Sequence, residues 1–234
     1  MADDLLWRHL KDLPYFRALL RAVEARFYQD IDLAEPILDL GCGDGHFASI
    51  ALDGRTPMVG VDPWWSPLTK TVKRQVYRYA IQSVGGALPF ASQYFSTVIS
   101  NSVLEHIPEL DPVLAEVNRV LKPGGTLILT YPNIRTALGI AMMLFYDIPP
   151  MYAARYRSPH YRDFTLRTIK MVLNNHGFTA SKAIGSAFYL PKIEEYWSWL
   201  ATYFPSWSHT VIVAATKTRD SKYSAEDARP SALY

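Results

Sequence analysis

The sequence predicts an α/β fold in which helices cover both faces of a mostly parallel, doubly wound sheet. Apolar segments typical of buried strands alternate with segments of helical periodicity between residues 36 and 131, and this alternation is typical of βαβ units. The run Ile37-Leu-Asp-Leu-Gly-Cys-Gly-Asp-Gly-His46 then joins a strand to a helix through glycines at alternate positions. Such a turn brings the backbone close to a ligand at the carboxyl end of a sheet.

The elements follow in order along the chain. Apolar residues at helical spacing over 4–29, interrupted by Pro14, predict two short helices. Strands are expected near 36–40, 58–62, 77–81, 97–101 and 125–131, with helices over 45–53, 66–75 and 110–121 between them. Lys122-Pro-Gly-Gly125 is expected to stop the last of these helices and to turn the chain into the fifth strand. A helix over 165–175 and strands near 179–185 and 209–217 complete the sheet.

These elements divide the chain into an N-terminal helical cap (1–34), a ligand-binding domain (35–217) and a polar tail (218–234) that we expect to be disordered. Two aromatic-rich segments, at about 134–163 and 189–207, do not fit a minimal sheet and are interpreted as inserts. Such segments favour a small-molecule ligand that is partly apolar or aromatic. The same surfaces are compatible with a peripheral membrane contact or a homodimer contact, so the sequence leaves a monomer or a homodimer open.

Composition limits the partners and the compartment. The 234 residues carry a net charge of +2 and no dense run of Lys and Arg, so we expect no nucleic-acid partner. The longest apolar run, 137–146, has about half the length of a transmembrane helix. Cys42 is the single cysteine, which excludes an internal disulfide. Together with an N-terminus unlike a signal peptide, it favours a cytoplasmic location.

A second strand supports a nucleotide-type site. Met58-Val-Gly-Val-Asp62 is an apolar strand that ends in an acid about 20 residues after the glycine turn, and a carboxylate at that place suits a ribose diol. The dinucleotide fingerprint G-x-G-x-x-G would place a glycine where this chain has His46. The sequence therefore favours a nucleoside ligand other than a dinucleotide.

Four segments, ILDLGCGDG, VGVD, LPFASQYFSTVISNSVLEHI and LKPGGTLILTYPN, resemble the successive motifs of class I S-adenosylmethionine-dependent methyltransferases, in the small-molecule branch with the ubiquinone and menaquinone enzymes. The resemblance covers residues 35–133, and more loosely the sheet to about 217. It implies a Rossmann-like seven-stranded sheet, mostly parallel with an antiparallel last strand, and S-adenosyl-L-methionine as cofactor. It also implies in-line transfer of a methyl group to a small acceptor, with O-methylation slightly favoured.

The resemblance implies a set of site residues. Asp39 would order the glycine loop or meet the amino group of the cofactor, and Asp62 would hold the ribose hydroxyls or else cap the next helix. His106 is the candidate base, because imidazole titrates near neutral pH, although a histidine here is also commonly structural. The cofactor-binding set is Asp39, Gly41, Cys42, Gly43, Gly45, Asp62, Pro63, Leu88, Asn101 and Ser102. The acceptor-side set is Tyr131, Asn133, Tyr152, Tyr156, His160 and Tyr161.

The chain also departs from the family pattern. Relatives place an acid shortly before Leu88 that accepts a hydrogen bond from adenine, whereas Ser83-Val-Gly-Gly-Ala87 contains none. Recognition of adenine then falls to backbone groups or to Ser83. This gap keeps open a cofactor-binding regulatory protein without turnover. A nicotinamide-dependent oxidoreductase is a separate and weaker alternative, because His46 occupies the last position of the dinucleotide fingerprint. Because no carboxylates cluster after the fourth strand, the sequence predicts no metal site.

Overall fold

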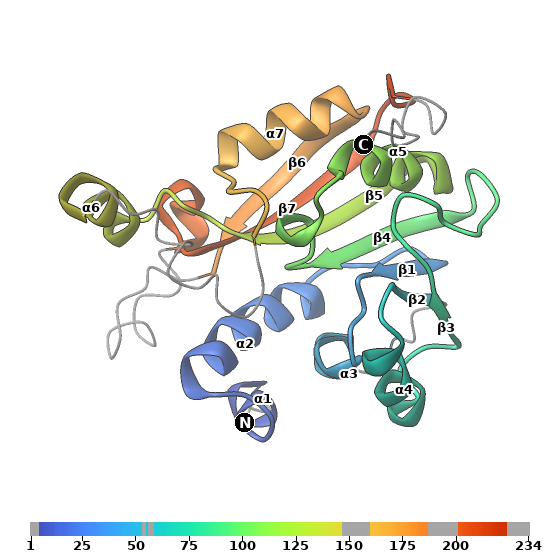
Figure 1. Cartoon of the computed structure of the whole chain (residues 1–234), viewed down its shortest axis with the longest axis horizontal. Helices are drawn as coiled ribbons and strands as arrows, with labels where there is room; N and C mark the ends of the chain where they lie inside the picture. The colour runs from blue at the N-terminus through green and yellow to red at the C-terminus, as the bar shows by residue number, and fades with distance from the viewer. Residues whose placement is uncertain (1–4, 53–54, 56–58, 147–159, 187–200, 224–234) are drawn as a thin grey trace, which may run out of the picture.

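The predicted sheet is present. The computed structural model describes residues 5–52, 55, 59–146, 160–186 and 201–223. The strand order is β3-β2-β1-β4-β5-β7-β6 (Figure 1), and β7 runs antiparallel to both β5 and β6. The order reverses between β1 and β4, which is the switch point where open α/β sheets bind ligands. The strands are β1 (Ile37–Leu40), β2 (Val59–Asp62), β3 (Tyr79–Gln82), β4 (Phe95–Asn101), β5 (Leu121–Pro132), β6 (Phe178–Gly185) and β7 (Thr210–Lys217).

Helices cover both faces of the sheet. On one face α5 and α7 pack over the strands, and on the other face lie the N-terminal helices and α3 (Figure 1). The helices are α1 (Leu5–Leu10), α2 (Tyr15–Gln29), α3 (His46–Ala51), α4 (Trp65–Arg74), α5 (Leu110–Val120), α6 (Ala137–Tyr146) and α7 (Leu166–Asn175), with 3₁₀ turns η1 (Leu104–His106) and η2 (Pro205–Trp207).

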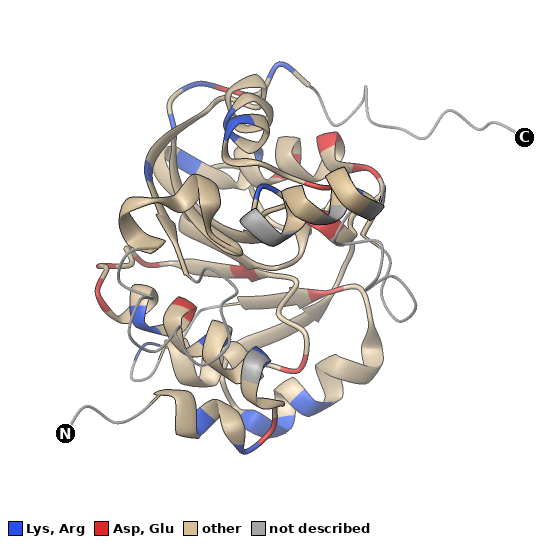
Figure 2. Cartoon of the chain, turned by 90° about the vertical axis from the view of Figure 1, so that its left-hand side faces the viewer, with Lys and Arg blue, Asp and Glu red and all other residues tan. Residues whose placement is uncertain are grey.

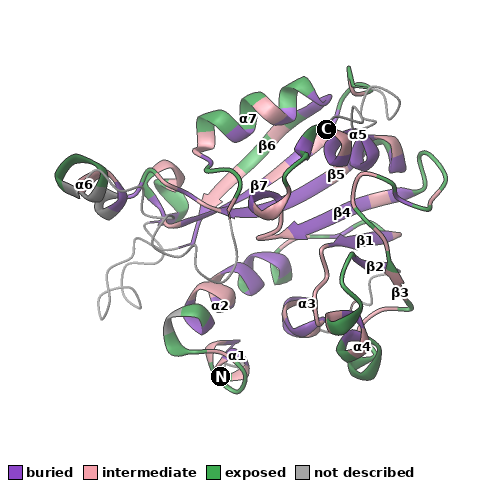
Figure 3. Ribbon diagram, viewed as in Figure 1, coloured by how far each residue is buried: buried purple, intermediate pink, exposed green. Residues whose placement is uncertain are grey.

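The apolar runs of the strands are explained by burial on both faces. Leu38 and Leu40 of β1 face the core under α5, while Ile37 packs with apolar residues on the opposite face beneath α2 and α3. Successive side chains of a strand alternate between faces, so a strand that is covered twice needs an apolar residue at almost every position. Figure 3 shows the central strands as mostly buried. Asp39 is the exception within β1, which marks it as a residue of the site.

Two boundaries differ from the predictions. Helix α5 ends at Val120 and β5 begins at Leu121, so the predicted turn at 122–125 is part of the strand. Gly124 takes a φ of +75° there, and the register between β4 and β5 shifts at the same place. At the other boundary, the backbone of Arg219 accepts a hydrogen bond from the buried amide of Asn118. The packed chain therefore continues past residue 217 to 223, and 224–234 lie outside the described residues.

The surface is mixed in charge and carries exposed apolar residues on α6. Acidic and basic residues occur together near the N-terminal helices and also on the far side of the sheet (Figure 2). Helix α6 exposes Met143, Leu144 and Phe145, which lie within the first expected insert. Among the described residues, no helix is both long and apolar enough to cross a membrane.

Candidate functional site

The glycine loop between β1 and α3 is held by the neighbouring strand. Gly41, Gly43 and Gly45 have φ values of +77°, +56° and +74°, a region that side chains disfavour. The amides of Gly41 and Cys42 both donate to the carbonyl oxygen of Val61, at 2.8 and 3.0 Å. A Cβ on Gly43 would meet no heavy atom within 4 Å. The loop is therefore fixed from below and open on the side of Gly43.

Asp62, at the end of β2, faces this loop. Its Oδ2 accepts a hydrogen bond from the Gly43 amide at 3.0 Å, and its Oδ1 accepts one from the Trp64 amide at 2.9 Å. The side chain does not accept a bond from the first turn of α4, whose N-cap is Trp64. Each carboxylate oxygen has a second lone pair, so Asp62 orders the loop and still keeps acceptor capacity for a ligand.

Asp39 has a different partner from the one expected. Its Oδ2 accepts a 2.5 Å hydrogen bond from the hydroxyl of Tyr77, which lies just before β3. Burial raises the pKa of Asp39 from 3.8 to about 7, and the Tyr77 bond opposes that rise. Burial also raises the pKa of the Cys42 thiol, with Asp39 and Asp62 adding to the effect. Cys42 is thus a neutral thiol beside the loop.

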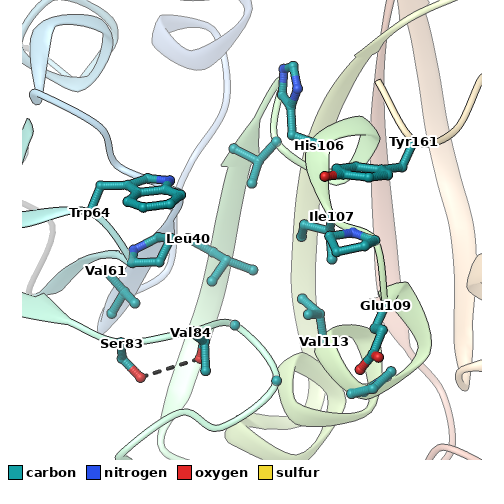
Figure 4. A pocket seen from close by; sticks show the side chains of 17 residues that line it. Leu40, Val61, Trp64, Ser83, Val84, His106, Ile107, Glu109, Val113 and Tyr161 are labelled. Atoms are coloured by element: carbon teal, nitrogen blue, oxygen red, sulfur yellow. Dashed lines mark hydrogen bonds between the residues drawn. The ribbon is translucent and has the colours of Figure 1, made fainter. Parts of the chain in front are cut away.

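A cavity of about 530 Å³ opens at the carboxyl ends of β1, β2 and β3, and we call it the large cavity. Figure 4 shows Trp64, Val61 and Leu40 on one side and Ile107, Val113 and Glu109 on the other. Most of its walls are apolar. The lining residues are Leu40, Gly41, Val61, Pro63, Trp64, Ser83, Val84, Gly85, Gly86, Val103, His106, Ile107, Pro108, Glu109, Pro112, Val113 and Tyr161.

The large cavity fits a nucleoside. Its volume falls within the range of about 300–1,000 Å³ of small-molecule sites, which are lined by apolar groups with few polar anchors. A Cβ on Gly41 would lie 2.5 Å from Cγ2 of Val103, and a Cβ on Gly85 would lie 3.0 Å from Val113. These glycines let their loops approach Val103 and Val113, which also line the cavity. The residues present therefore suit the adenosyl group that the family resemblance implies.

A second cavity of about 180 Å³, the small cavity, lies where α2 meets the carboxyl ends of β4 and β5 and the amino end of β7. Arg21 of α2 donates to Glu24 at 2.6 Å and to the Ser102 hydroxyl at 3.2 Å, and Asn101 donates to Glu24 at 3.1 Å. This cavity has a more polar lining than the large cavity. It is lined by Arg17, Leu20, Arg21, Glu24, Ser102, Glu105, His106, Pro132, His160, His209 and Thr210.

Ser102 is held in an unusual conformation between the cavities and β5. Its φ is +54°, which costs a residue other than glycine about 1–3 kcal/mol and tends to occur at functional sites. Its amide donates to the carbonyl and to the hydroxyl of Thr130, at 3.1 and 3.0 Å. The strained turn at the end of β4 is therefore fixed by the neighbouring strand.

Most of the predicted site residues line one of the two cavities or support its walls. Gly41, Pro63, His106 and Tyr161 line the large cavity, and Ser102, His106 and His160 line the small one. Asp39, Cys42, Gly43, Gly45, Asp62 and Asn101 form the loop and the strand ends that support these cavities. Tyr152 and Tyr156 lie outside the described residues.

Three predicted residues lie in the protein interior, in contrast to the roles expected for them. Leu88 is buried in the core, and its amide donates to Glu116 at 2.9 Å. Tyr131 is fully buried against Phe164, with ring centroids 5.6 Å apart. The amide of Asn133 donates to two backbone carbonyls near η2. None of the three lines either described cavity, because their side chains fill the space between the sheet and the chain that covers it.

Several residues of the site had no signal in the sequence. Glu109 brings a carboxylate to the large cavity, opposite Ser83 (Figure 4), although the usual acid before Leu88 is missing. Arg21 and Glu24 come from α2, and Tyr77 precedes an edge strand. The one available signal was local: Glu105 stands directly before His106 in a segment already assigned to the site.

A methyltransferase domain family model matches residues 6–182. An uncharacterized methyltransferase of Mycolicibacterium gilvum is 27% identical over 179 residues, which cover 72% of this chain and 69% of the relative. One of Mycobacterium leprae is 33% identical over 97 residues, which cover 41% of this chain. That match spans only 36% of the length of the M. leprae protein.

Solved structures share the fold at low sequence identity. A S-adenosylmethionine-dependent methyltransferase of Thermotoga maritima superimposes with a TM-score of 0.67 at 19% identity, over 91% of this chain and 98% of that protein. A geranyl diphosphate C-methyltransferase of Streptomyces coelicolor gives a TM-score of 0.57 at 14% identity, over 87% of this chain and 82% of that protein.

Proposed function

The chain belongs to the methyltransferase domain family, and from this premise we propose that it transfers a methyl group from S-adenosylmethionine to a small-molecule acceptor. The observation that carries the proposal is Asp62, whose carboxylate joins the glycine loop to the wall of the large cavity. An acid at the end of the second strand, beside a fixed glycine loop, suits the ribose of an adenosyl group.

We assign the holding of the cofactor to three parts of the chain. The free lone pairs of Asp62 would accept the ribose hydroxyls, and Pro63 and Trp64 would cover one face of the adenosine. Glu109 would accept the hydrogen bond of the adenine amino group in place of the missing acid, because it lines the same cavity opposite Ser83. The open space beside Gly43 would admit the methionine portion.

The cofactor supplies an electrophilic methyl group whose positive sulfur loses its charge during transfer. The chain therefore needs to stabilise little new charge, and its main contribution is alignment in a site from which water is excluded. Correct orientation of the reactants alone can lower the activation barrier by about 7–11 kcal/mol. The conformation of Ser102 and the fixed glycine loop provide such a rigid frame.

The acceptor is expected on the side of the small cavity. His106 lines both cavities, so a base at this residue would reach an acceptor hydroxyl held between them. Four charged side chains line the small cavity (Arg17, Arg21, Glu24 and Glu105), which favours a hydroxylated molecule and thus O-methylation. Its apolar or aromatic portion would lie against the expected inserts, most of which are outside the described residues. A cytoplasmic location is part of the same proposal.

Binding and turnover are tested separately. Titration with S-adenosylhomocysteine in a calorimeter should give one site per chain and raise the melting temperature, since a ligand that binds only the folded state stabilises it. Labelled-methyl transfer to extract metabolites, followed by mass spectrometry of the product, then tests turnover. No heat and no thermal shift would refute the proposal, and binding without any transfer would favour the regulatory alternative. Binding of NADH in place of S-adenosylhomocysteine would favour the oxidoreductase.

A further inference from the structure

Three side chains that ligate metals in other proteins meet at the boundary of the two cavities. Glu105 and His106 lie in η1, and His160 comes from the chain that precedes α7. One ligand atom from each, a carboxylate oxygen and two imidazole nitrogens, lies within 4.8 Å of the other two. The two imidazole rings are 4.6 Å apart between centroids and nearly perpendicular, at 79°. Their nitrogens can therefore point to one place without the rings stacking.

The backbone holds these side chains together. The Tyr161 amide donates to the carbonyl of Glu105 at 2.8 Å, and the guanidinium of Arg162 donates to the carbonyl of Pro108 at 2.6 Å. These bonds tie residues 160–162 to residues 105–108 on both sides of the cluster. The approach of His160 to Glu105 is therefore built into the fold at this point and does not depend on its own side-chain rotamer alone.

Glu105 supplies a second, independent observation that points to a ligand at this cluster. Its side chain is only 2% exposed, and its Oε2 has no hydrogen-bond partner among the described residues. A buried carboxylate oxygen without a partner is costly. The nearby guanidinium of Arg21 donates instead to Glu24 and Ser102 through Nη1. Among the described residues, the Glu105 oxygen therefore points into the cluster without a donor to satisfy it.

We propose that Glu105, His106 and His160 bind one divalent transition-metal ion. Two imidazole nitrogens and one carboxylate oxygen are the ligand set of open zinc sites and of non-haem iron sites, which leave further positions free. The set lacks the several oxygen ligands that Mg²⁺ and Ca²⁺ prefer. The sequence predicted no metal site because the carboxylates after β4 do not cluster. His160, which completes the set, is distant in the sequence and is brought in only by the fold.

The place of the ion suggests its use. His106 lines both cavities, and Glu105 and His160 line the small one, so the ion would stand at the acceptor side of the large cavity. A cation there would hold an oxygen atom of the acceptor and lower the pKa of its hydroxyl. With the ion bound, this effect would replace the role of His106 as a base, because a metal-bound imidazole has no lone pair left to accept a proton. This use rests on the proposed function, whereas the binding of the metal does not.

The test uses the full chain after dialysis against a chelator. Calorimetric titration with Zn²⁺ should give one ion per chain, and Co²⁺ should give the visible absorption bands of a site with fewer than six ligands. Removing a group that only hydrogen-bonds to a metal ligand typically weakens metal binding by about 10–100-fold. Glu105→Gln and His160→Ala each remove a direct ligand, so each should weaken Zn²⁺ binding by about 100-fold or more and abolish the cobalt bands.

Two matched controls come from the same surroundings. Glu109→Gln changes a carboxylate of the large cavity and His209→Asn a histidine of the small cavity, and both lie outside the cluster. Each should bind Zn²⁺ as the unchanged chain does. Circular dichroism and thermal melting show whether each variant folds. Glu105→Gln keeps the shape of the side chain and removes the buried charge, so it should be at least as stable as the unchanged chain without metal.

Either of two results would overturn the site: no Zn²⁺ binding by the unchanged chain, or equal binding by Glu105→Gln and His160→Ala in folded form. Equal weakening by His209→Asn would overturn the assignment of the ligands. S-adenosylhomocysteine binding is measured on the same samples. Binding of Zn²⁺ without binding of S-adenosylhomocysteine would support the metal site and refute the proposed function. Binding of S-adenosylhomocysteine without Zn²⁺ would support the proposed function and refute the metal site.

Discussion

Replacing Gly43 by alanine separates what the glycine loop does for folding from what it does for binding. Gly43 has a φ of +56°, and a Cβ there would meet no heavy atom within 4 Å. The cost to the folded chain is then the left-handed backbone alone, about 1–2 kcal/mol for an L-residue. In a chain of this length, that cost corresponds to a fall in melting temperature of about 2–8 °C.

Gly124→Ala is the matched control. Gly124 has a φ of +75°, and a Cβ there also meets nothing within 4 Å, but it lies at the start of β5 and lines neither cavity. Both variants should therefore lose similar stability. Only Gly43→Ala places a methyl group in the space that we assign to the cofactor. It should weaken S-adenosylhomocysteine binding at least tenfold, which corresponds to about 1.4 kcal/mol.

The assay combines chemical denaturation, which gives the free energy of unfolding, with calorimetric titration of S-adenosylhomocysteine. Tight binding by Gly43→Ala, equal to that of the unchanged chain, would refute the assignment of this space to the cofactor. A much larger loss of stability in Gly43→Ala than in Gly124→Ala would instead show that the space beside Gly43 is filled in solution.

The remaining predictions concern the walls of the site. Gly41→Ala should lose about 1–3 kcal/mol more than Gly43→Ala in denaturation, since its Cβ would lie 2.5 Å from Val103; equal losses would contradict this. Asp62→Asn leaves one of two backbone N–H groups without an acceptor, so it should lose about 1–3 kcal/mol of stability and at least tenfold in calorimetric affinity. Glu109→Gln should weaken S-adenosylhomocysteine more than S-inosylhomocysteine, which lacks the adenine amino group, and equal effects would remove Glu109 from adenine recognition. Because the folded pKa of Asp39 lies near 7, above its ordinary 3.8, the folded state binds this proton more tightly. Its contribution to stability therefore falls as pH rises from about 4 to about 7. Asp39→Asn should match the unchanged chain in urea denaturation near pH 4 and exceed it by up to about 4 kcal/mol above pH 7, and a constant difference would refute the shift.

The pH dependence of stability has to be compared between the unchanged chain and Asp39→Asn, because other groups titrate in the same pH range. Burial lowers the pKa of His9 to about 4, and the neighbouring His46 adds to this shift. The unfolded state therefore binds that proton more tightly than the folded state, and stability from His9 rises as pH increases from about 4 to 6.5. This trend opposes that of Asp39, so only the difference between two chains that share His9 isolates the carboxyl group.

The contact between the glycine loop and Asp62 was predictable because its determinants are local in sequence. Gly41, Gly43 and Asp62 lie on consecutive strands of a parallel sheet, and the carboxyl ends of such strands always share one edge. The alternating strand and helix patterns predicted that both strands end at this edge of the sheet, so the glycine loop and Asp62 were expected to meet there. Leu88 was misplaced because a family motif gives a position along the chain and not the direction of a side chain.

The rest of the site depends on contacts between distant segments. Tyr77 reaches Asp39, Glu109 lines the large cavity, and His160 joins Glu105. In a sequence, each of these residues is one polar residue on an apparently ordinary loop. Only the packing of β3 on β2, and of residues 160–162 on residues 105–108, shows which of them face a cavity.

Helix α2 explains why the cofactor can be named from the sequence and the acceptor cannot. Glu24 is 2% exposed and accepts hydrogen bonds from Arg21 and Asn101, and Asn101 accepts one from Thr130 in turn. The N-terminal helix thereby forms a wall of the small cavity through buried charges that it supplies itself. Because the acceptor is expected in that cavity, its identity depends on a helix outside the four motifs. Changes at Arg21 or Glu24 should therefore alter the choice of acceptor while S-adenosylhomocysteine binding stays the same.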